Sequence, residues 1–249
     1  MTEPLLQVRK LCKSFGAITA SDGLDLTIIP GEIHALIGPN GAGKSTAIHQ
    51  LSGETKADSG SIHFAGQNIT DWPAHRRTKA GIARSYQITR LFQALTVRDN
   101  LAIAVQAADR HHFKFWRPAA DDPTLIEPVN ALMDSLGLHL IADQRISEIG
   151  HGQQRQVELA MGLALQPQLL LLDEPMAGMS SSETQHMAQQ LERLRGRITL
   201  LLVEHDMDVV FRLADRISVL VKGQVICTDT PDAVRQNPTV QAAYLGDGG

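Results

Sequence analysis

The chain has 249 residues and a mass of 27.1 kDa, enough to bury a sizeable core in one α/β domain, with or without an inserted subdomain. Its 43% hydrophobic and 20% charged residues exclude a disordered or fibrous protein. A formal net charge of −4 argues against a strongly basic surface, so nucleic acid is not expected as a partner.

The cysteines and the lengths of the apolar runs limit the class of protein further. Cys12 and Cys227 are far apart and have no metal-binding spacing, so we expect two reduced thiols. The amino-terminal residues show no basic-then-apolar signal pattern. Wholly apolar runs such as Leu169–Leu172 are far shorter than the roughly 20 residues of a membrane-spanning helix. We therefore expect a chain that is neither secreted nor membrane-spanning.

The first quarter of the chain has the pattern of strands and turns. Leu24–Ile28 alternates apolar and polar side chains, which predicts a half-buried strand. Ile33–Ile37 is almost wholly apolar, which is typical of a buried strand. A glycine-rich loop follows, and a helical pattern runs from Ser45 to about Leu51.

The middle of the chain changes character. Helical composition predicts helices at Val97–Ala108 and Leu125–Leu136, and we interpret residues 88 to about 165 as a mostly helical insert. Two apolar strands come after it, Leu169–Leu172 and Leu200–Val203.

A polar helical stretch, Ser182–Leu194, separates those two strands. Strands alternating with helices predict an α/β fold with a largely parallel, buried sheet. We expect the last residues, 246–249, to be a loose tail.

Residues 38–46 read GPNGAGKST and fit the phosphate-loop pattern G-x-x-x-x-G-K-[ST]. Gly38 and Gly43 let successive backbone N–H groups turn toward phosphate oxygens, and the following helix adds its positive end. Lys44 has the reach to contact the β- and γ-phosphates, and we expect the Ser45 hydroxyl to be a ligand for Mg²⁺. The alternative is a glycine-rich turn without a ligand, but the strand before it and the helix after it favour the phosphate loop.

Polar side chains follow both later strands. Asp173 and Glu174 come directly after four leucines, where one carboxylate is able to hold Mg²⁺ and the other is able to polarise a water aimed at the γ-phosphate. His205 follows the next strand and faces the ligand crevice that forms at the carboxyl ends of parallel strands. The alternatives are two solvated acids at a strand end and a structural histidine.

The ordered set of motifs resembles the ATP-binding subunits of ABC transporters along essentially the whole chain. The set is GPNGAGKST, Gln87 in ARSYQ, GHGQQRQ at 150–156, LLLLDEP and VEHD. The resemblance implies a P-loop NTPase fold of the ABC ATPase type. Such a fold has a mainly parallel sheet, an N-terminal antiparallel β portion and a helical subdomain at about 88–165, all within one domain spanning 1–249.

The resemblance also implies roles for single residues. Phe15 matches the aromatic that stacks on adenine, Gln87 the residue that contacts Mg²⁺ and the attacking water, and His205 the switch histidine. Asp173 matches the Mg²⁺ acid and Glu174 the general base. The implied catalytic residues are Lys44, Gln87, Glu174 and His205, and the implied metal ligands are Ser45, Gln87 and Asp173. The implied nucleotide contacts are Phe15, Gly38, Pro39, Asn40, Gly41, Ala42, Gly43, Lys44, Ser45, Thr46, Gly150, His151, Gly152 and Gln153.

Residues 149–155, IGHGQQR, match the family signature LSGGQQR. Gly150 to Gln153 would lie at a helix N-terminus and bind the γ-phosphate of ATP held by the opposite subunit. Two departures stand out within the signature, Gly150 for serine and His151 for glycine. In the loop 177–180, which crosses the dimer interface in the family, Ser180 replaces the common aspartate. Backbone amides and the helix dipole survive these changes, so binding is expected to persist.

Four segments resemble those of the branched-chain amino acid importer group, which includes urea-type and related amide importers. They are the variant signature, DEPMAGM, VEHDMDVV and NPTVQAAYLG. This implies ATP and Mg²⁺ as cofactors and a second ATP-binding subunit, identical or different. It also implies two membrane permease subunits, a periplasmic solute-binding protein as an indirect partner, and a peripheral place on the cytoplasmic face of the inner membrane. The alternatives are urea import, a soluble ABC-type ATPase outside transport, and a nucleotide-dependent kinase.

Three further features have plain interpretations. His111-His112 lacks a further metal ligand nearby, so we expect a solvated loop there. Trp116, in the same loop, either contacts a partner or packs locally. Arg76-Arg77 is expected to be a solvated charge pair.

Overall fold

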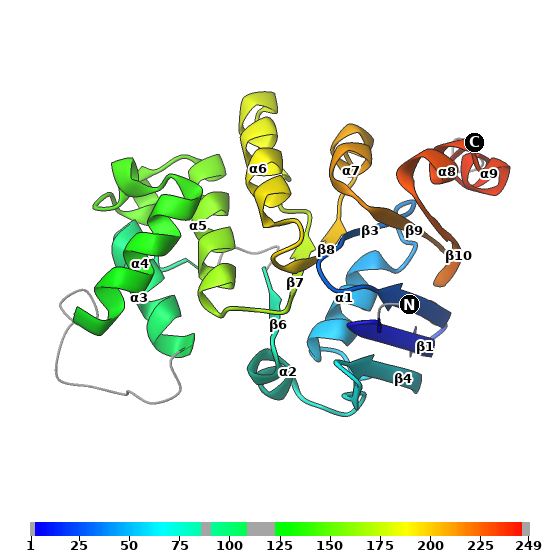
Figure 1. The fold of residues 1–249 in the computed structure, drawn as a ribbon. Helices are drawn as coiled ribbons and strands as arrows, with labels where there is room; N and C mark the ends of the chain where they lie inside the picture. Colours follow the sequence, from blue (N-terminus) through cyan, green and yellow to red (C-terminus); the bar gives the residue numbers. More distant parts are fainter. Residues whose placement is uncertain (1–2, 86–90, 109–122, 246–249) are drawn as a thin grey trace.

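A computed structural model describes residues 3–85, 91–108 and 123–245 and arranges them as two β-sheets with helices around them (Figure 1). The larger sheet has the strand order β10-β9-β3-β8-β7-β6. The pairs between β9, β3, β8, β7 and β6 are parallel, and β10 pairs antiparallel with β9. Its strands are β3 (Ile33–Ile37), β6 (Ile82–Arg84), β7 (Leu169–Asp173), β8 (Thr199–Val203), β9 (Arg216–Val221) and β10 (Gln224–Asp229).

The smaller sheet is antiparallel and has the order β2-β1-β4-β5. Its strands are β1 (Leu6–Phe15), β2 (Ile18–Ile28), β4 (Ser59–Phe64) and β5 (Gln67–Asn68). One face of this sheet and the helix α1 (Lys44–Ser52) pack against one face of the larger sheet in a shared hydrophobic cluster. The parallel sheet and the N-terminal antiparallel portion confirm the predicted fold class.

The leucines of β7 are divided between the two faces of the larger sheet. Leu169 and Leu171 of β7 join the cluster under the antiparallel sheet, whereas Leu170 and Leu172 join a second cluster on the opposite face. Successive side chains of a strand point to opposite faces, and both faces of this sheet are covered. All five residues of β7 are therefore buried.

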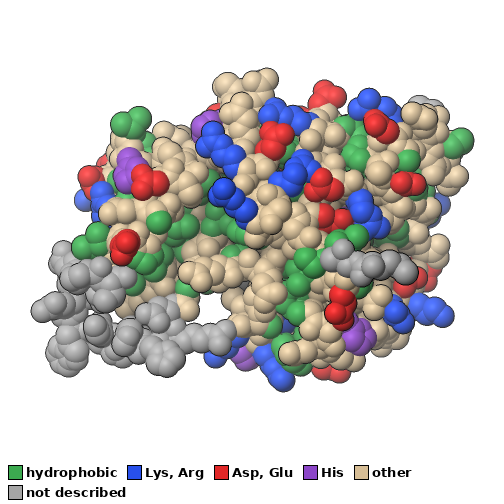
Figure 2. Space-filling model, viewed as in Figure 1, with side chains coloured by type: hydrophobic (Ala, Val, Ile, Leu, Met, Phe, Trp, Pro, Cys, Tyr) green, Lys and Arg blue, Asp and Glu red, His purple; other side chains and the backbone are tan. Residues whose placement is uncertain are grey.

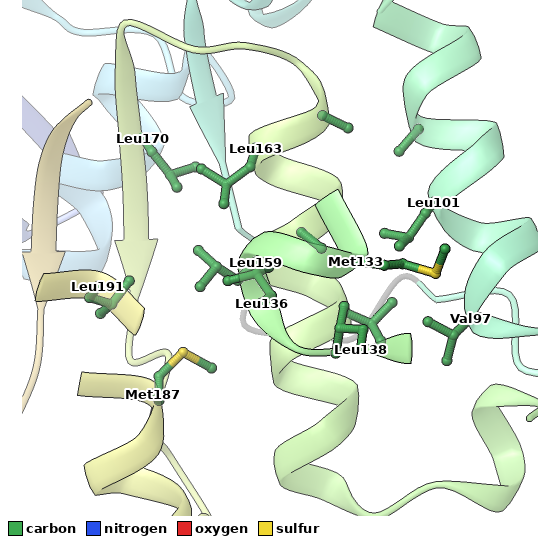
Figure 3. Packing of buried hydrophobic residues seen from close by; sticks show 14 of the residues in the cluster. Val97, Leu101, Met133, Leu136, Leu138, Leu159, Leu163, Leu170, Met187 and Leu191 are labelled. Atoms are coloured by element: carbon green, nitrogen blue, oxygen red, sulfur yellow. The ribbon is translucent and has the colours of Figure 1, made fainter. Parts of the chain in front are cut away.

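The described chain between β6 and β7 is helical. It contains α3 (Val97–Ala108), α4 (Pro123–Leu136), the short 3₁₀ turns η2 (His139–Ile141) and η3 (Ile146–Glu148), and α5 (His151–Ala164). These helices lie together at the side of the molecule away from the antiparallel sheet (Figure 1). Figure 3 shows their shared apolar core, in which Leu101, Met133 and Leu159 are buried. Leu170 of β7 belongs to the same cluster, so the helical region packs directly on the sheet.

The remaining helices flank the larger sheet. They are α2 (Ala74–Ala80), α6 (Ser181–Leu194), α7 (Met207–Leu213), α8 (Pro231–Gln236) and α9 (Pro238–Leu245). Acidic and basic side chains are interspersed over α6 and α7 in the space-filling view (Figure 2). Among the described residues, no helix is long and apolar enough to span a membrane.

The predicted elements agree with the structure, with small shifts at their ends. The helix expected from Ser45 begins at Lys44, and the one expected at Ser182 begins at Ser181. The predicted helix Leu125–Leu136 begins at Pro123. The strand at Leu24–Ile28 is the end of the longer β2, which starts at Ile18. The half-buried Cys12 and Cys227 are free thiols, as expected.

The prediction of a solvated pair at Arg76-Arg77 is wrong for Arg77. Its side chain is 2% exposed, and it donates to the main-chain oxygens of Gln50, Leu51, Thr70 and Trp72 at 2.6–2.9 Å. Two of these carbonyls belong to the last turn of α1, where helix carbonyls have no intrahelical donor. Burial lowers the pKa of Arg77 to about 10. Arg76 is exposed and stacks on the Trp72 ring.

Some sequence expectations fall on residues outside the described part of the chain. These are the loop with His111, His112 and Trp116, the residue Gln87, and the tail 246–249.

Candidate nucleotide site

The phosphate loop connects β3 to α1 and passes tightly between neighbouring strands. A Cβ added to Gly38 would lie 2.1 Å from the carbonyl oxygen of Leu220 in β9. One added to Gly43 would lie 2.1 Å from the carbonyl oxygen of Ala20 in β2, and Gly43 has a φ of 105°. Only glycine fits at these two positions, which explains the spacing of the glycines in the motif.

Lys44 is 7% exposed and folds back over the loop. Its Nζ donates to the carbonyl oxygens of Gly38 at 2.6 Å and Pro39 at 3.0 Å. Burial lowers the pKa of Lys44, and the negative charges of Glu174 and Asp173 oppose this. A desolvated ammonium at this point favours an anionic partner, which would compensate the burial of its charge.

The start of α1 supplies further groups for an anion. The first turn contains no acidic residue, and its N-cap, Gly43, makes no side-chain capping bond. Ser45 is exposed and Thr46 is half-buried. The helix N-terminus therefore presents backbone N–H groups and hydroxyls beside the loop, as an anion site requires.

Asp173 ends β7 and is buried, with 1% of its surface exposed. Its Oδ2 accepts from Arg84 Nη2 at 3.1 Å, and Arg84 also pairs with Glu54. Asp173 Oδ1 has no hydrogen-bond partner among the described residues, although it is buried. Burial raises the pKa of Asp173, and the positive charge of Arg84 opposes the rise. A buried carboxylate oxygen without a donor fits a metal ion or a metal-bound water.

Glu174 and His205 come together across the ends of β7 and β8. The Glu174 Oε1 lies 2.5 Å from the His205 Nε2, and the Glu174 N–H donates to the carbonyl oxygen of Val203. Glu174 has a φ of 50°, a left-handed backbone conformation that is costly for residues other than glycine. The side chain of His205 is half exposed, whereas that of Glu174 is mostly covered.

Sequence reasoning overlooked Glu204, which organises this part of the site. Its carboxylate is 5% exposed and accepts from the main-chain N–H groups of Met176 and His205. Burial raises the pKa of Glu204, and the hydrogen bonds from Met176 and His205 oppose the rise. The signal in the sequence was a glutamate directly after an apolar strand. The sequence pattern assigned a functional role to the neighbouring His205 and none to Glu204.

The phosphate loop and the residues after β8 line one cleft. One side of the cleft is formed by Gly38, Pro39 and Asn40, and the other by Glu204, His205 and Met207. The cleft has a volume of about 220 Å³. Both segments follow parallel strands, whose carboxyl ends lie at the same edge of the sheet. The structure therefore places Lys44, Asp173, Glu174 and His205 at that edge.

Phe15 lies at the end of β1, opposite Ile18 of β2, and is 52% exposed. Lys13 Nζ lies 5.4 Å from the centre of its ring. The close approach of Ala20 to Gly43 brings this hairpin against the phosphate loop. An exposed aromatic ring beside a phosphate site provides a stacking surface for a purine base.

The signature segment lies elsewhere. Gly150 is the N-cap of α5, and its N–H donates to Gln153 Oε1 at 3.0 Å, so the segment forms a helix N-terminus as expected. Within the described residues, no hydrogen bond joins residues 150–153 to residues 38–46.

The family of this chain follows from its similarity to known proteins. The sequence profile described as ABC transporter matches residues 21–177, and the one described as branched-chain amino acid ATP-binding cassette transporter matches residues 224–249. The high-affinity branched-chain amino acid transport ATP-binding protein LivG of Escherichia coli K12 is 34% identical over 99% of this chain and 100% of its own length. The chain belongs to the ABC transporter ATP-binding family.

Further relatives agree with this membership. The corresponding protein BraF of Pseudomonas aeruginosa is 33% identical over 99% of this chain and 100% of its own length. Among solved structures, MJ1267, an ATP-binding cassette of an ABC transporter, superposes with a TM-score of 0.87 at 28% identity, covering 98% of this chain and 99% of that one. The protein is thus a nucleotide-binding ABC ATPase, and the P-loop NTPase fold inferred from its motifs is confirmed.

Proposed function

We propose that this cassette hydrolyses ATP to power the import of branched-chain amino acids, or of a related small amino acid or amide. The observation that carries the ATPase chemistry is the gathering of Lys44, Asp173, Glu174 and His205 at one edge of the sheet. The solute class is supported by the names of the relatives and by the match of residues 224–249 to the branched-chain profile.

The donor set fits Mg²⁺. The orphaned Oδ1 of Asp173 and the exposed hydroxyl of Ser45 are hard oxygen ligands, which this ion prefers. Gln87 completes the proposed set and lies outside the described residues. When bound, the ion supplies charge neutralisation at the phosphates.

Glu174 has the position of a general base. Its carboxylate is held by His205 and would take a proton from water as that water attacks the γ-phosphorus. The bond from the γ-phosphorus to the bridging oxygen breaks, and ADP and inorganic phosphate leave. Lys44 exchanges its contacts with the loop carbonyls for phosphate oxygens and stabilises the developing charge.

The assembly we propose contains a second cassette, identical or different. The phosphate loop of one subunit, with Pro39 to Thr46 around the triphosphate and Phe15 on the adenine, faces residues 150–153 of the other. Two permease subunits and a periplasmic binding protein would select the solute, and the cassettes would sit on the cytoplasmic face of the membrane. Residues 88–165 form the helical subdomain of the single domain 1–249 in this proposal.

Uptake into vesicles tests the proposal. The cassette is reconstituted with its permeases, and ATP-dependent uptake of labelled leucine is compared with uptake of labelled urea. We expect leucine uptake that Lys44→Ala abolishes and that Lys222→Ala, at an exposed turn, leaves intact. Uptake of urea alone would contradict the solute class, and equal uptake by the Lys44→Ala variant would contradict the ATPase role.

A further inference from the structure

The signature segment touches the loop 177–180 of its own chain. His151, the first residue of α5, lies with its Nε2 3.3 Å from the carbonyl oxygen of Ala177. A carbonyl oxygen only accepts, so Nε2 must carry the proton in this contact. His151 stands where the family signature has a glycine, so this hydrogen bond is a feature of the variant sequence.

The loop is shaped to receive the imidazole. Gly178 has a φ of 78°, and a Cβ added to it would lie 3.3 Å from His151 Nε2 and 3.4 Å from Cδ2. The ring therefore rests against the backbone of Gly178. His151 is itself exposed, so this contact adds little to the buried core and instead fixes two surface segments to each other.

Glu183 makes a second connection between the same segments. Its carboxylate accepts from the N–H and the hydroxyl of Ser180, which closes the capping box of α6. A Cβ added to Gly152 would lie 2.3 Å from Glu183 Oε1. The pKa of Glu183 is lowered chiefly by hydrogen bonds from the hydroxyl and the N–H of Ser180, and the Gly152 N–H contributes as well.

The loop leads directly to the proposed general base. The Ala177 N–H donates to the carbonyl oxygen of Glu174 at 3.1 Å, and the Ala177 carbonyl accepts from His151. One residue thus connects the left-handed turn at Glu174 with the N-terminus of α5.

We propose that His151 is a positioning residue that, with Glu183, holds the signature segment in register with the Glu174 loop of the same subunit. The segment presented to the partner's nucleotide then moves together with this subunit's own catalytic carboxylate. The inference rests on the proposed function, in which the signature segment completes the ATP site of a second cassette.

ATP-driven association tests this role in the full chain. In a Glu174→Gln background, which suppresses turnover, sedimentation velocity with Mg-ATP gives the association constant of the cassettes. His151→Leu removes the donor, whereas His151→Gln keeps an N–H at a similar distance from the backbone. We expect His151→Leu to weaken association about three- to tenfold, the range of one ordinary hydrogen bond, and His151→Gln to stay within about twofold of the parent.

Two controls separate positioning from folding and from nucleotide binding. His139→Leu removes another exposed histidine, one that bonds to Asp134, and should leave association unchanged. Binding of a fluorescent ATP analogue to the single subunit should be equal in all variants, because His151 lies outside its own phosphate loop.

Association of His151→Leu as tight as that of the parent would overturn the inference, and so would a His151→Gln variant as weak as His151→Leu. If the Glu174→Gln parent binds ATP and does not associate, the shared site of the proposed function fails and the inference fails with it.

Discussion

At the scale of single residues, Glu174 combines a strained backbone with a carboxylate fixed by a neighbour. Its left-handed backbone is held by the bond from its N–H to Val203, and its carboxylate is held by His205. Such strain persists only where surrounding contacts determine the conformation. The constraint aims the carboxylate at one place, as a base that must act on a single water requires.

Glu174→Gln should lower ATP turnover by about 10²- to 10⁴-fold, the usual contribution of a general base, and leave ATP binding intact. Phosphate release and binding of a fluorescent ATP analogue measure the two quantities. Glu192→Gln is the control, since Glu192 pairs with Arg212 on the exposed side of α6. A variant that retains most of its turnover would show that another group accepts the proton.

Gly150→Ser should raise turnover, because a serine there adds a hydroxyl donor toward the γ-phosphate. Gly150 has a φ of −66°, and a Cβ would have only Gln153 Oε1 nearby, at 3.8 Å, so a side chain fits without strain. We expect an increase of about two- to tenfold, the range of one hydrogen bond. The ATPase rate of the reconstituted complex measures it, and an unchanged rate would refute the hypothesis.

The residues that sequence reasoning located are those whose position follows from local pattern. Lys44 follows a strand and starts a helix, and Asp173 ends a strand, so each can be placed from its neighbours in sequence. Arg77 and Glu204 could not be placed in this way. Arg77 is buried because four carbonyls from α1 and its surroundings converge on it, and Glu204 because it spans two strand ends. Such contacts depend on tertiary structure.

At the scale of elements, Arg77 joins α2 to the end of α1. Arg77→Ala should lower the free energy of unfolding by about 2–4 kcal/mol, because buried carbonyls lose their donors. The adjacent Arg76→Ala is the matched control and should change it by less than about 1 kcal/mol, since Arg76 is exposed. Urea unfolding measures both. If both variants lowered the free energy of unfolding equally, the buried hydrogen bonds of Arg77 would stabilise the fold no more than the exposed side chain of Arg76 does.

The start of β3 is tied to its neighbours by a buried polar chain. His34 is fully buried, and its ring nitrogens lie 2.9 Å from Glu32 Oε1 and 2.8 Å from Ser218 Oγ in β9. Ser218 in turn contacts Thr228 of β10. The pKa of Glu32 is lowered: burial alone would raise it, but the hydrogen bonds from His34 and the Ile29 N–H outweigh that effect.

This depressed pKa predicts a pH dependence. Glu32 binds its proton less readily in the folded than in the unfolded chain, so its contribution to stability is present above the ordinary carboxyl pKa of 4.5. It is lost as pH falls through the lower pKa of the folded chain. Glu32→Gln should therefore flatten the acid decline of the unfolding free energy, measured by urea titration from pH 6 to acid. Glu3→Gln, at an exposed position, is the control, and an equal decline in Glu32→Gln would contradict the prediction.

At the scale of the whole molecule, the alternation of apolar strands and helices predicted the fold class. A strand is apolar along its length when other elements cover both faces of its sheet, and helices are the usual cover of a parallel sheet. The same pattern did not reveal α7, α8 or α9. The described helices α7 and α8 are one to two turns long, and their apolar faces become visible only against β9 and β10. Short elements that depend on a finished sheet carry little periodicity of their own.

The chain also separates the two halves of its proposed chemistry. The phosphate loop and Glu174 lie at the sheet edge, and residues 150–153 begin α5 without a hydrogen bond to that loop among the described residues. In the proposed assembly, the signature segment of a second cassette completes each ATP site.

Sedimentation velocity of the Glu174→Gln variant, alone and with its second cassette, shows whether ATP joins two cassettes at shared sites. With Mg-ATP we expect a dimer with one nucleotide at each phosphate loop, and with ADP or after Lys44→Ala we expect monomers. A Glu174→Gln variant that is saturated with ATP and stays monomeric in both mixtures would contradict this expectation.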